Sequence, residues 1–338
     1  MSNTIFTKKN FYLIAEIGGN HQGSFEKAKN ICDLAIKSGA DCVKFQLYTA
    51  GNLVNKKVDL ERYKHFKNFE LKREEHLFLA QKCKEADVDY TASVWDMEMF
   101  EWIEPHMQFI KVGSGDLTSY NFLKLFAQTN KPIVLSSGLS YKKEVHEAID
   151  YIRKCNPNYY ECGMLSILQC TSMYPIGDSD ANLATIKELA KIENIIPGYS
   201  DHTVGLEALV HSISFGARVL EFHFTDNKNN KSFRDHQVSL ELNDVIRLRE
   251  DCNKLVSMIG NPQKIPLKIE IDNGHRISFR RAIFPSRDIK AGEILTEENI
   301  HCLRPNKGIC ASKYNILIGK KAKTNLMKDQ QLEWDMFH

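Results

Sequence analysis

Two histidines each follow a short apolar run that is typical of a β-strand. His202 lies in Gly-Tyr-Ser-Asp-His-Thr (198–203), and His223 lies in Leu-Glu-Phe-His-Phe-Thr (220–225). In a barrel of parallel strands the strand ends meet at one rim, which would bring the two imidazoles together. Neutral imidazole is the commonest protein ligand of divalent transition metals, and two such ligands leave positions open for water or substrate oxygen. The pair is therefore a candidate catalytic metal site. The plainer interpretation is two hydrogen-bonded core or turn residues.

The ends of the other apolar runs also carry side chains that could do chemistry. They are Glu16, Lys44 and Gln46, Ser93, Lys111 and Ser114, Ser136 and Ser137, Ser172 and Tyr174, and Ser200. Two lysines among several hydroxyl and Gly-Ser backbone donors form a cationic pocket that suits a phosphate together with a carboxylate. A carboxylate such as Glu16 beside a metal could move protons during bond formation. Each residue alone could be a strand-end cap, a solvated lysine or an ion-paired carboxylate. Their occurrence at every strand end favours an enzyme site.

These side chains need a scaffold in which the strand ends converge. Short apolar runs predict strands at Tyr12–Ile17, Cys42–Leu47, Asp89–Ser93, Phe109–Gly113, Ile133–Ser136, Leu165–Cys170, Ile195–Tyr199 and Val219–His223. Helical spacing of apolar residues occurs between them, as at Glu26–Lys37, Arg73–Lys84, Glu144–Lys154 and Leu206–Phe215. About eight such units over roughly 250 residues match a closed (β/α)₈ barrel, the TIM barrel. A doubly wound open sheet is the alternative, but Gly18-Gly19 does not continue into the full Gly-x-Gly-x-x-Gly turn.

The character of the sequence changes after the predicted barrel, which occupies residues 1–259. Residues 260–279 contain Pro262, Pro266 and a mixed polar run, which indicates a linker. Residues 280–338 are predicted to form a small domain of short elements, with a turn at 290–293. Because about 60 residues give only a marginal core, we expect this domain to lean on another surface.

The composition of the chain argues against several classes of protein. The 338 residues carry a net charge of +2, which gives no argument for nucleic acid or a membrane as partner. The nine cysteines form no Cys-x-x-Cys pair, so we expect reduced cysteines in a cytoplasmic protein and neither a zinc knuckle nor a disulfide framework. Glu16 interrupts the first apolar run, so we expect neither a signal peptide nor a membrane span.

Several longer motifs occur in a fixed order along the chain. The barrel region contains Ala-Glu-Ile-Gly-Gly-Asn-His-Gln-Gly (15–23), Gly-Ala-Asp-Cys-Val-Lys-Phe-Gln (39–46), Lys-Pro-Ile-Val-Leu-Ser-Ser-Gly (131–138), Gly-Tyr-Ser-Asp-His-Thr-Val-Gly (198–205) and Asp-His-Gln-Val-Ser-Leu (235–240). The tail contains Asp-Ile-Lys-Ala-Gly-Glu (288–293), Leu-Arg-Pro (303–305) and Ile-Gly-Lys (318–320). Together these motifs resemble the N-acetylneuraminate (sialic acid) synthase family of nonulosonate synthases, the tail resembling its antifreeze-like (SAF) domain.

The resemblance implies a transferase that condenses phosphoenolpyruvate with an N-acyl hexosamine aldehyde. The products would be a nine-carbon 2-keto sugar acid and phosphate, formed with cleavage of a C–O bond. His202 and His223 would hold a divalent ion, Mn²⁺ by preference with Mg²⁺ or Co²⁺ as alternatives, and Glu16 would be the main acid or base. Phosphoenolpyruvate would be bound by Lys44, Ser93, Lys111, Ser114, Ser136 and Ser200, and the sugar by Gln46, Ser172, Tyr174, Asp235 and Arg304. Arg304 would reach from the small domain into the barrel of a partner subunit, in a domain-swapped homodimer.

The chain departs from the family pattern mainly where the sugar would bind. Ser172 replaces an asparagine, and Ser232-Phe233-Arg234 replaces a Gly-Pro before Asp235. The sugar therefore stays open between N-acetylmannosamine and a diacetamido-trideoxyhexose, the second giving legionaminic or pseudaminic acid. Two further hypotheses are a metal-free Schiff-base aldolase that uses Lys44 or Lys111, and a carbohydrate-binding barrel without activity.

Overall fold

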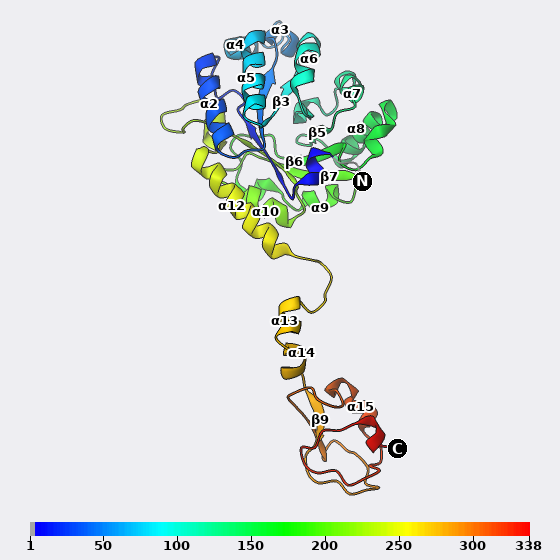
Figure 1. Cartoon of the computed structure of the whole chain (residues 1–338). Coiled ribbons are helices and arrows are strands. Elements are labelled where there is room, and N and C mark those ends of the chain that lie inside the picture. Colours follow the sequence, from blue (N-terminus) through cyan, green and yellow to red (C-terminus); the bar gives the residue numbers. More distant parts are fainter. Residues whose placement is uncertain (1–3) are drawn as a thin grey trace. The chain divides into compact units, whose positions relative to one another are not determined.

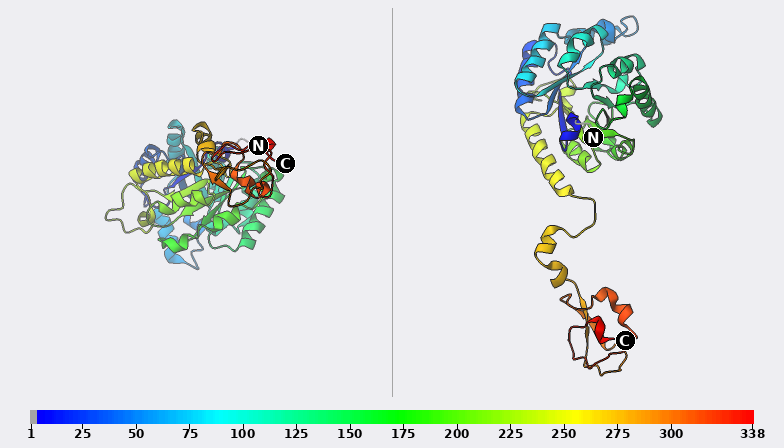
Figure 2. Two further views of the ribbon diagram at one scale, coloured as in Figure 1. Left: turned by 90° about the horizontal axis from the view of Figure 1, so that it is seen from below. Right: turned by 45° about the vertical axis from the view of Figure 1, so that its right-hand side comes forward.

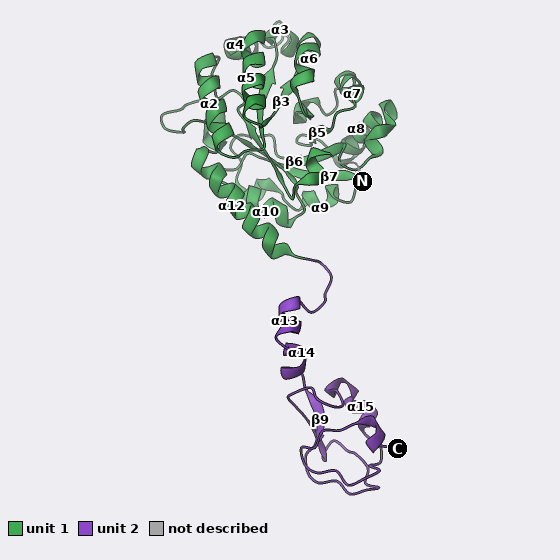
Figure 3. Ribbon diagram, in the orientation of Figure 1, with its two compact units in different colours: residues 1–260 green, residues 261–338 purple. Residues whose placement is uncertain are grey.

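The computed structural model describes residues 4–338, so residues 1–3 of the predicted barrel lie outside the described part. The chain divides into two compact units between Gly260 and Asn261 (Figure 3). The predicted linker, residues 260–279, falls almost wholly in the second unit and contains two short helices, α13 (Lys268–Asp272) and α14 (His275–Ser278). Its prolines indicated irregular chain, but the Glu270 carboxylate accepts a hydrogen bond from the Leu267 amide at 2.7 Å and caps α13.

Eight parallel strands close into a barrel in chain order, with helices around them (Figures 1 and 2). The strands are β1 (Tyr12–Glu16), β2 (Cys42–Leu47), β3 (Asp89–Val94), β4 (Ile110–Val112), β5 (Ile133–Ser136), β6 (Leu165–Cys170), β7 (Ile195–Asp201) and β8 (Val219–His223). β1 closes the barrel because it pairs with both β2 and β8, which sets Glu16 beside Lys44 on one side and His223 on the other. The predicted (β/α)₈ barrel is confirmed, and a closed sheet excludes the open, doubly wound alternative.

The helices of the first unit cover the outside of the barrel, except α1 (Ile5–Lys8), whose Phe6 packs among inward-facing residues at one end. They are α1 (Ile5–Lys8), α2 (Phe25–Lys37), α3 (Ala50–Leu53), α4 (Leu60–Phe69), α5 (Arg73–Glu85), α6 (Met97–Ile103), α7 (Tyr120–Ala127), α8 (Lys142–Cys155), α9 (Thr185–Leu189), α10 (Glu207–Ser214), α11 (Asp235–Val238) and α12 (Leu242–Ile259), with short 3₁₀ turns η1 (Glu104–His106), η2 (Ser114–Asp116), η3 (Pro157–Tyr160) and η4 (Asp178–Ala181). The helices predicted from periodicity correspond to α2, α5, α8 and α10. The sequence did not reveal α4, because this helix has no buried residue and therefore no apolar stripe.

The interior of the barrel changes from apolar to polar along its axis. At the N-terminal ends of the strands, Phe6 of α1 packs edge-on against Tyr12 and Phe109, with ring centroids 5.3 and 5.2 Å apart. The same inward layer includes Ile14, Cys42, Val134, Leu168, Ile196 and Val219. Since side chains alternate along a strand, the next inward residues after Cys42, Phe109 and Val219 are Lys44, Lys111 and Glu221. An apolar plug therefore closes one end of the barrel, and charged groups stand above it.

The second unit has a small core of its own. β9 (Ala282–Pro285) pairs antiparallel with β10 (Ile300–Leu303), and the unit also contains α15 (Tyr314–Leu317), η5 (Ala311–Lys313) and η6 (Trp334–Met336). The turn predicted at 290–293 is present, because the Glu293 amide donates to the Lys290 carbonyl at 3.0 Å and Gly292 has a φ of +84°. Within residues 4–338, none of the helices combines the length and apolar character needed to cross a bilayer.

A buried histidine makes the stability of the barrel depend on pH. Burial, together with the nearby His21, lowers the pKa of His76 on α5 to about 3. Because the unfolded chain takes up this proton below pH 6.5 and the folded chain does not, folding loses stability as the pH falls from 6.5 toward 3. We expect His76→Leu to remove about 2 kcal/mol of the stability difference between pH 7 and pH 5, measured by urea denaturation. His106→Leu, at an exposed histidine, is the control. Parallel pH profiles for the wild type and His76→Leu would contradict the prediction.

Candidate active site

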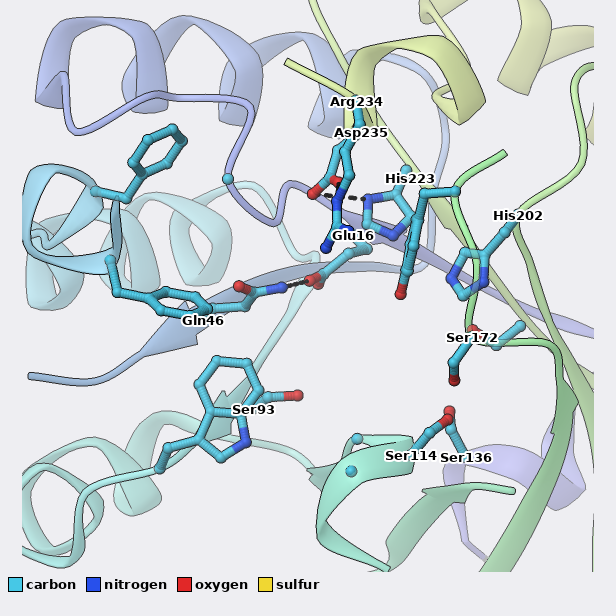
Figure 4. A pocket seen from close by; sticks show the side chains of 18 of the residues that line it. Glu16, Gln46, Ser93, Ser114, Ser136, Ser172, His202, His223, Arg234 and Asp235 are labelled. Carbon is cyan, nitrogen blue, oxygen red and sulfur yellow. Dashed lines mark hydrogen bonds and ion pairs between the residues drawn. The ribbon is translucent and has the colours of Figure 1, made fainter. Parts of the chain in front are cut away.

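A cavity of about 1000 Å³ opens at the C-terminal ends of the strands. It is lined by all of the site residues predicted in the barrel: Glu16, Lys44, Gln46, Ser93, Lys111, Ser114, Ser136, Ser172, Tyr174, Ser200, His202, His223 and Asp235. This rim is where barrel enzymes hold their active sites, because loops that follow different strands converge there. In Figure 4, Gln46 points toward Glu16, and the two imidazoles lie next to one another.

The floor of the cavity is a chain of alternating charges. Lys44 Nζ donates to Glu16 Oε2 at 2.6 Å and lies 3.3 Å from Glu221 Oε1. Lys111 Nζ lies 3.3 Å from Glu221 Oε2 and donates to Ser136 Oγ at 2.8 Å. All four charged side chains are almost fully buried. Glu221 therefore bridges the two lysines. The two lysines predicted to form a cationic pocket lie together, and each also has a carboxylate partner: Glu16 pairs with Lys44, as its plainer interpretation proposed, and Glu221 lies beside both lysines.

The charged neighbours decide the protonation states on this floor. Burial alone would lower the pKa of Lys44, but Glu16 and Glu221 outweigh it and raise the pKa above its usual value. Burial does prevail at Lys111 and lowers its pKa, although Glu221 opposes the effect. Burial would raise the pKa of Glu221, yet Lys111 and Lys44 together lower it to about 2. Glu221 is therefore a carboxylate at neutral pH, and Lys111 loses its proton more readily than Lys44 does.

The two histidines at the strand ends lie side by side. Their ring centroids are 5.4 Å apart, and burial lowers the pKa of both imidazoles. His202 Nδ1 lies 2.7 Å from the Thr171 carbonyl oxygen, which can only accept, so Nδ1 carries the proton and Nε2 keeps its lone pair. Among residues 4–338, His223 Nδ1 has no hydrogen-bond partner, and it lies 3.8 Å from Asp235 Oδ2. Within the described part of the chain, no three His, Cys, Asp or Glu side chains gather as a metal-binding group.

Gly18 lies directly against the reactive side chains. A Cβ at this position would stand 3.4 Å from Glu16 Oε1, from the His223 ring and from Asp235 Oδ2. Its φ of +53° is in the left-handed region that favours glycine. The backbone conformation therefore favours glycine here, whereas a Cβ would only make van der Waals contact with the three side chains.

The remaining predicted residues divide between the floor and the wall. Gln46 Nε2 donates to Glu16 Oε1 at 2.7 Å, so Lys44 and Gln46 together fix both carboxylate oxygens. Ser114 Oγ accepts a hydrogen bond from the Gly138 amide at 3.1 Å, and Ser93 and Ser200 are buried in the lining. Tyr174 packs against His202 with ring centroids 4.0 Å apart.

Arg304 belongs to the second unit. It follows β10, is exposed, and its guanidinium lies 5.3 Å from the centre of the Phe279 ring. Its predicted contact with a sugar stays a prediction.

Sequence reasoning missed Glu221 and the aromatic lining. Glu221 precedes His223 by two residues, so the alternation of a strand places both on the inner face. That signal was present, but Glu221 stands inside an apolar run and not at its end. The aromatic lining includes Tyr48, Phe66, Phe69, Trp95 and Phe233. Its members come from separate loops and from the unpredicted α4, so no local pattern could have assembled them.

Comparison with known proteins places the chain in a family. Residues 31–264 match the NeuB family, and residues 280–338 match the SAF domain. The chain is 31% identical to the N,N'-diacetyllegionaminic acid synthase of Campylobacter jejuni, over 95% of this chain and 98% of that protein. It is 30% identical to the human N-acetylneuraminate-9-phosphate synthase, over 95% of this chain and 91% of that protein. The crystal structure of the sialic acid synthetase of Leptospira borgpetersenii, at 24% identity, has the same fold, with a TM-score of 0.72 over 78% of this chain and 90% of that one. The chain therefore belongs to the NeuB family of nonulosonate synthases and carries a SAF domain at its C-terminal end.

Proposed function

We propose that the protein condenses phosphoenolpyruvate with an N-acyl hexosamine aldehyde to give a nine-carbon 2-keto sugar acid and phosphate, as a transferase that cleaves a C–O bond. The observation that carries the proposal is the convergence of Lys44, Lys111, Glu16 and the two imidazoles on one cavity lined with serine hydroxyls. The relatives named as legionaminic acid and N-acetylneuraminate-9-phosphate synthases support it.

The floor residues would bind the enol phosphate. Lys44 and Lys111 supply charge-assisted donors for phosphate and carboxylate oxygens, and hydroxyls such as Ser136 add neutral donors. Glu221 lies 3.3 Å from each lysine and favours the charged form of both. Glu16 would move or orient a proton during condensation, because Lys44 and Gln46 fix its carboxylate toward the cavity.

We further propose that His202 and His223 hold a divalent ion, Mn²⁺ by preference. The donor set fits, because His202 presents Nε2 with a free lone pair and His223 Nδ1 has no hydrogen-bond partner. A bound ion would polarise the aldehyde oxygen as a Lewis acid. Asp235 Oδ2, 3.8 Å from His223 Nδ1, would place a carboxylate next to that ion.

The test is phosphate release from phosphoenolpyruvate with a panel of N-acyl hexosamines. We expect release with at least one sugar, loss of release with a chelator, and recovery on addition of Mn²⁺. If sugars bind measurably but none of them leads to phosphate release, the non-catalytic carbohydrate-binding barrel would be favoured.

One observation favours a second candidate, the Schiff-base aldolase. Burial lowers the pKa of Lys111, which increases the fraction of neutral amine available as a nucleophile. Lys44 is disfavoured in this role, because its pKa is raised. Borohydride reduction in the presence of a carbonyl substrate, followed by mass spectrometry, distinguishes the two mechanisms, because only the Schiff-base aldolase gives a covalent lysine adduct.

We also propose that the protein is a domain-swapped homodimer in which Arg304 reaches the sugar in the cavity of the partner subunit. The segment before β9 exposes Ile265, Leu267, Ile269 and Ile271, an apolar surface of the kind that a partner covers. We expect Arg304→Ala to raise the KM for the sugar about 10-fold or more, because a charged hydrogen bond is lost. The KM for phosphoenolpyruvate serves as the control. A monomer by light scattering would contradict the assembly, and an unchanged sugar KM would contradict the role of Arg304.

A further inference from the structure

The cavity has an aromatic wall beside its polar floor. This wall consists of Tyr48, Phe66, Phe69, Trp95 and Phe233. From this wall we infer that the sugar substrate is an uncharged 2,4-di(acylamino)-2,4,6-trideoxyhexose and not N-acetylmannosamine or its 6-phosphate. The inference rests on the proposed condensation and names its second substrate.

The wall is a packed arrangement of rings from distant parts of the chain. Phe69 of α4 lies 5.1 Å from Phe233, which is in the loop between β8 and α11. Tyr48, after β2, lies 5.2 Å from Phe66 and 5.7 Å from Trp95, which follows β3. These are ring-centroid distances at which aromatic pairs attract one another. The rings therefore support each other in two groups, and the His65 imidazole lies between them, 5.5 Å from Phe66 and 4.6 Å from Phe69.

The wall begins next to the reactive groups. A Cβ on Gly19 would stand 2.8 Å from the Phe233 ring and 3.2 Å from the Phe69 ring. The preceding residue, Gly18, lies against Glu16 and His223. A sugar whose C1 lies at Glu16 and His223 therefore has the rest of its carbons within reach of the aromatic wall.

The chemistry of the wall discriminates between the sugars. N-acetylmannosamine carries hydroxyl groups at C4 and C6, whereas the trideoxy sugar carries an acylamino group and a methyl group there. Burying a methyl group against aromatic rings lowers the free energy of binding. Burying a hydroxyl group there raises it, because the hydroxyl gives up its hydrogen bonds to water and finds no partner in their place. One methyl group in an apolar pocket changes kcat/KM by about 10- to 200-fold. The wall therefore favours the sugar with the larger apolar surface.

The charges near the wall do not favour a phosphate on C6. The two arginines of the lining each lie over an aromatic ring, Arg62 at 5.7 Å from Phe66 and Arg234 at 4.9 Å from Tyr174. Arg234 also pairs with Asp235 at 3.5 Å, and the Glu61 carboxylate lines the same cavity as Arg62. Glu61 itself pairs with Lys64 at 2.8 Å. Both guanidinium groups are thus engaged by aromatic rings, and that of Arg234 is also paired with a carboxylate, which suits an uncharged ligand better than a phosphate.

The first experiment compares kcat/KM for three aldehydes at saturating phosphoenolpyruvate, by phosphate release. The aldehydes are 2,4-diacetamido-2,4,6-trideoxymannose, N-acetylmannosamine and N-acetylmannosamine 6-phosphate. We expect the trideoxy sugar to be preferred by about 10- to 200-fold. A preference for either of the other two overturns the inference and leaves the proposed condensation intact. No release with any of the three overturns the proposed condensation, and this inference with it.

The second experiment tests the wall itself. We expect Phe233→Ala and Phe69→Ala to reduce the preference for the trideoxy sugar about 10-fold, while the KM for phosphoenolpyruvate stays unchanged. Phe233→Leu should retain the preference, because the surface stays apolar. Tyr63→Ala, on α4 but outside the cavity lining, is the matched control. An unchanged preference in both alanine variants would show that the wall does not select the sugar and would overturn the inference.

Discussion

His223→Ala is expected to reduce turnover about 1000-fold, because the proposed metal site loses one of its two imidazoles. A polarising metal contributes several kcal/mol to the transition state, and each 1.4 kcal/mol corresponds to a factor of ten in rate. His202 Nδ1 is held by the Thr171 carbonyl oxygen at 2.7 Å and lies 3.9 Å from Cys170 Sγ, so the variant leaves His202 as the one remaining imidazole of the proposed pair. The measurement is phosphate release, together with metal content by mass spectrometry.

His211→Ala is the matched control for this variant. His211 lies on α10, away from the lining of the cavity, so turnover and bound metal should stay at the wild-type values. Full activity and unchanged metal content in His223→Ala would refute the metal assignment. Loss of activity with retained metal would assign His223 to the sugar or to proton transfer.

Glu221→Gln is expected to lower the free energy of unfolding by about 3 kcal/mol. The substitution leaves Lys44 paired with Glu16, whereas the buried Lys111 loses its ion pair, and an uncompensated buried charge costs about this much. Urea denaturation measures the change. Glu188→Gln, at an exposed ion pair with Lys191, should leave the unfolding free energy almost unchanged.

Phosphoenolpyruvate should rescue the Glu221→Gln variant. If the two lysines bind this anion, its negative charge replaces that of the missing carboxylate. The ligand should therefore raise the melting temperature more in the variant than in the wild type. Equal shifts in the two proteins would mean that the anion does not bind at Lys44 and Lys111.

Much of the barrel could be predicted because its signals are local. A run such as Ile133–Ser136 is apolar and short, and the hydroxyl that ends it marks the rim. The ends of parallel strands must converge, so placing Ser136, His202 and His223 on one rim needed no knowledge of contacts. The ion pairs of the cavity floor could not be predicted in this way. Glu221 stands inside an apolar run, and its partners are far away in sequence, so only the closed barrel shows that it neutralises both lysines.

The aromatic wall is the second feature of the site that could not be predicted from the sequence. Phe69 and Phe233 are more than a hundred and sixty positions apart, and they meet because both pack over Gly19. The helix that carries Phe69 buries no residue, so its sequence lacks the stripe that makes other helices recognisable. Sequence propensity predicts the secondary structure of a single segment. The aromatic wall depends on contacts between segments that are distant in the sequence, so propensity could not predict it.

The apolar plug formed by Phe6, Tyr12 and Phe109 has a consequence for the order of events in catalysis. Because the plug closes the barrel below the lysines, both substrates must enter from the rim. If Lys44 and Lys111 bind phosphoenolpyruvate and the aromatic wall binds the sugar, as proposed, phosphoenolpyruvate lies deeper than the sugar and has to arrive first. Steady-state kinetics should therefore be sequential and ordered, with phosphoenolpyruvate leading. A dead-end sugar analogue should be uncompetitive against phosphoenolpyruvate.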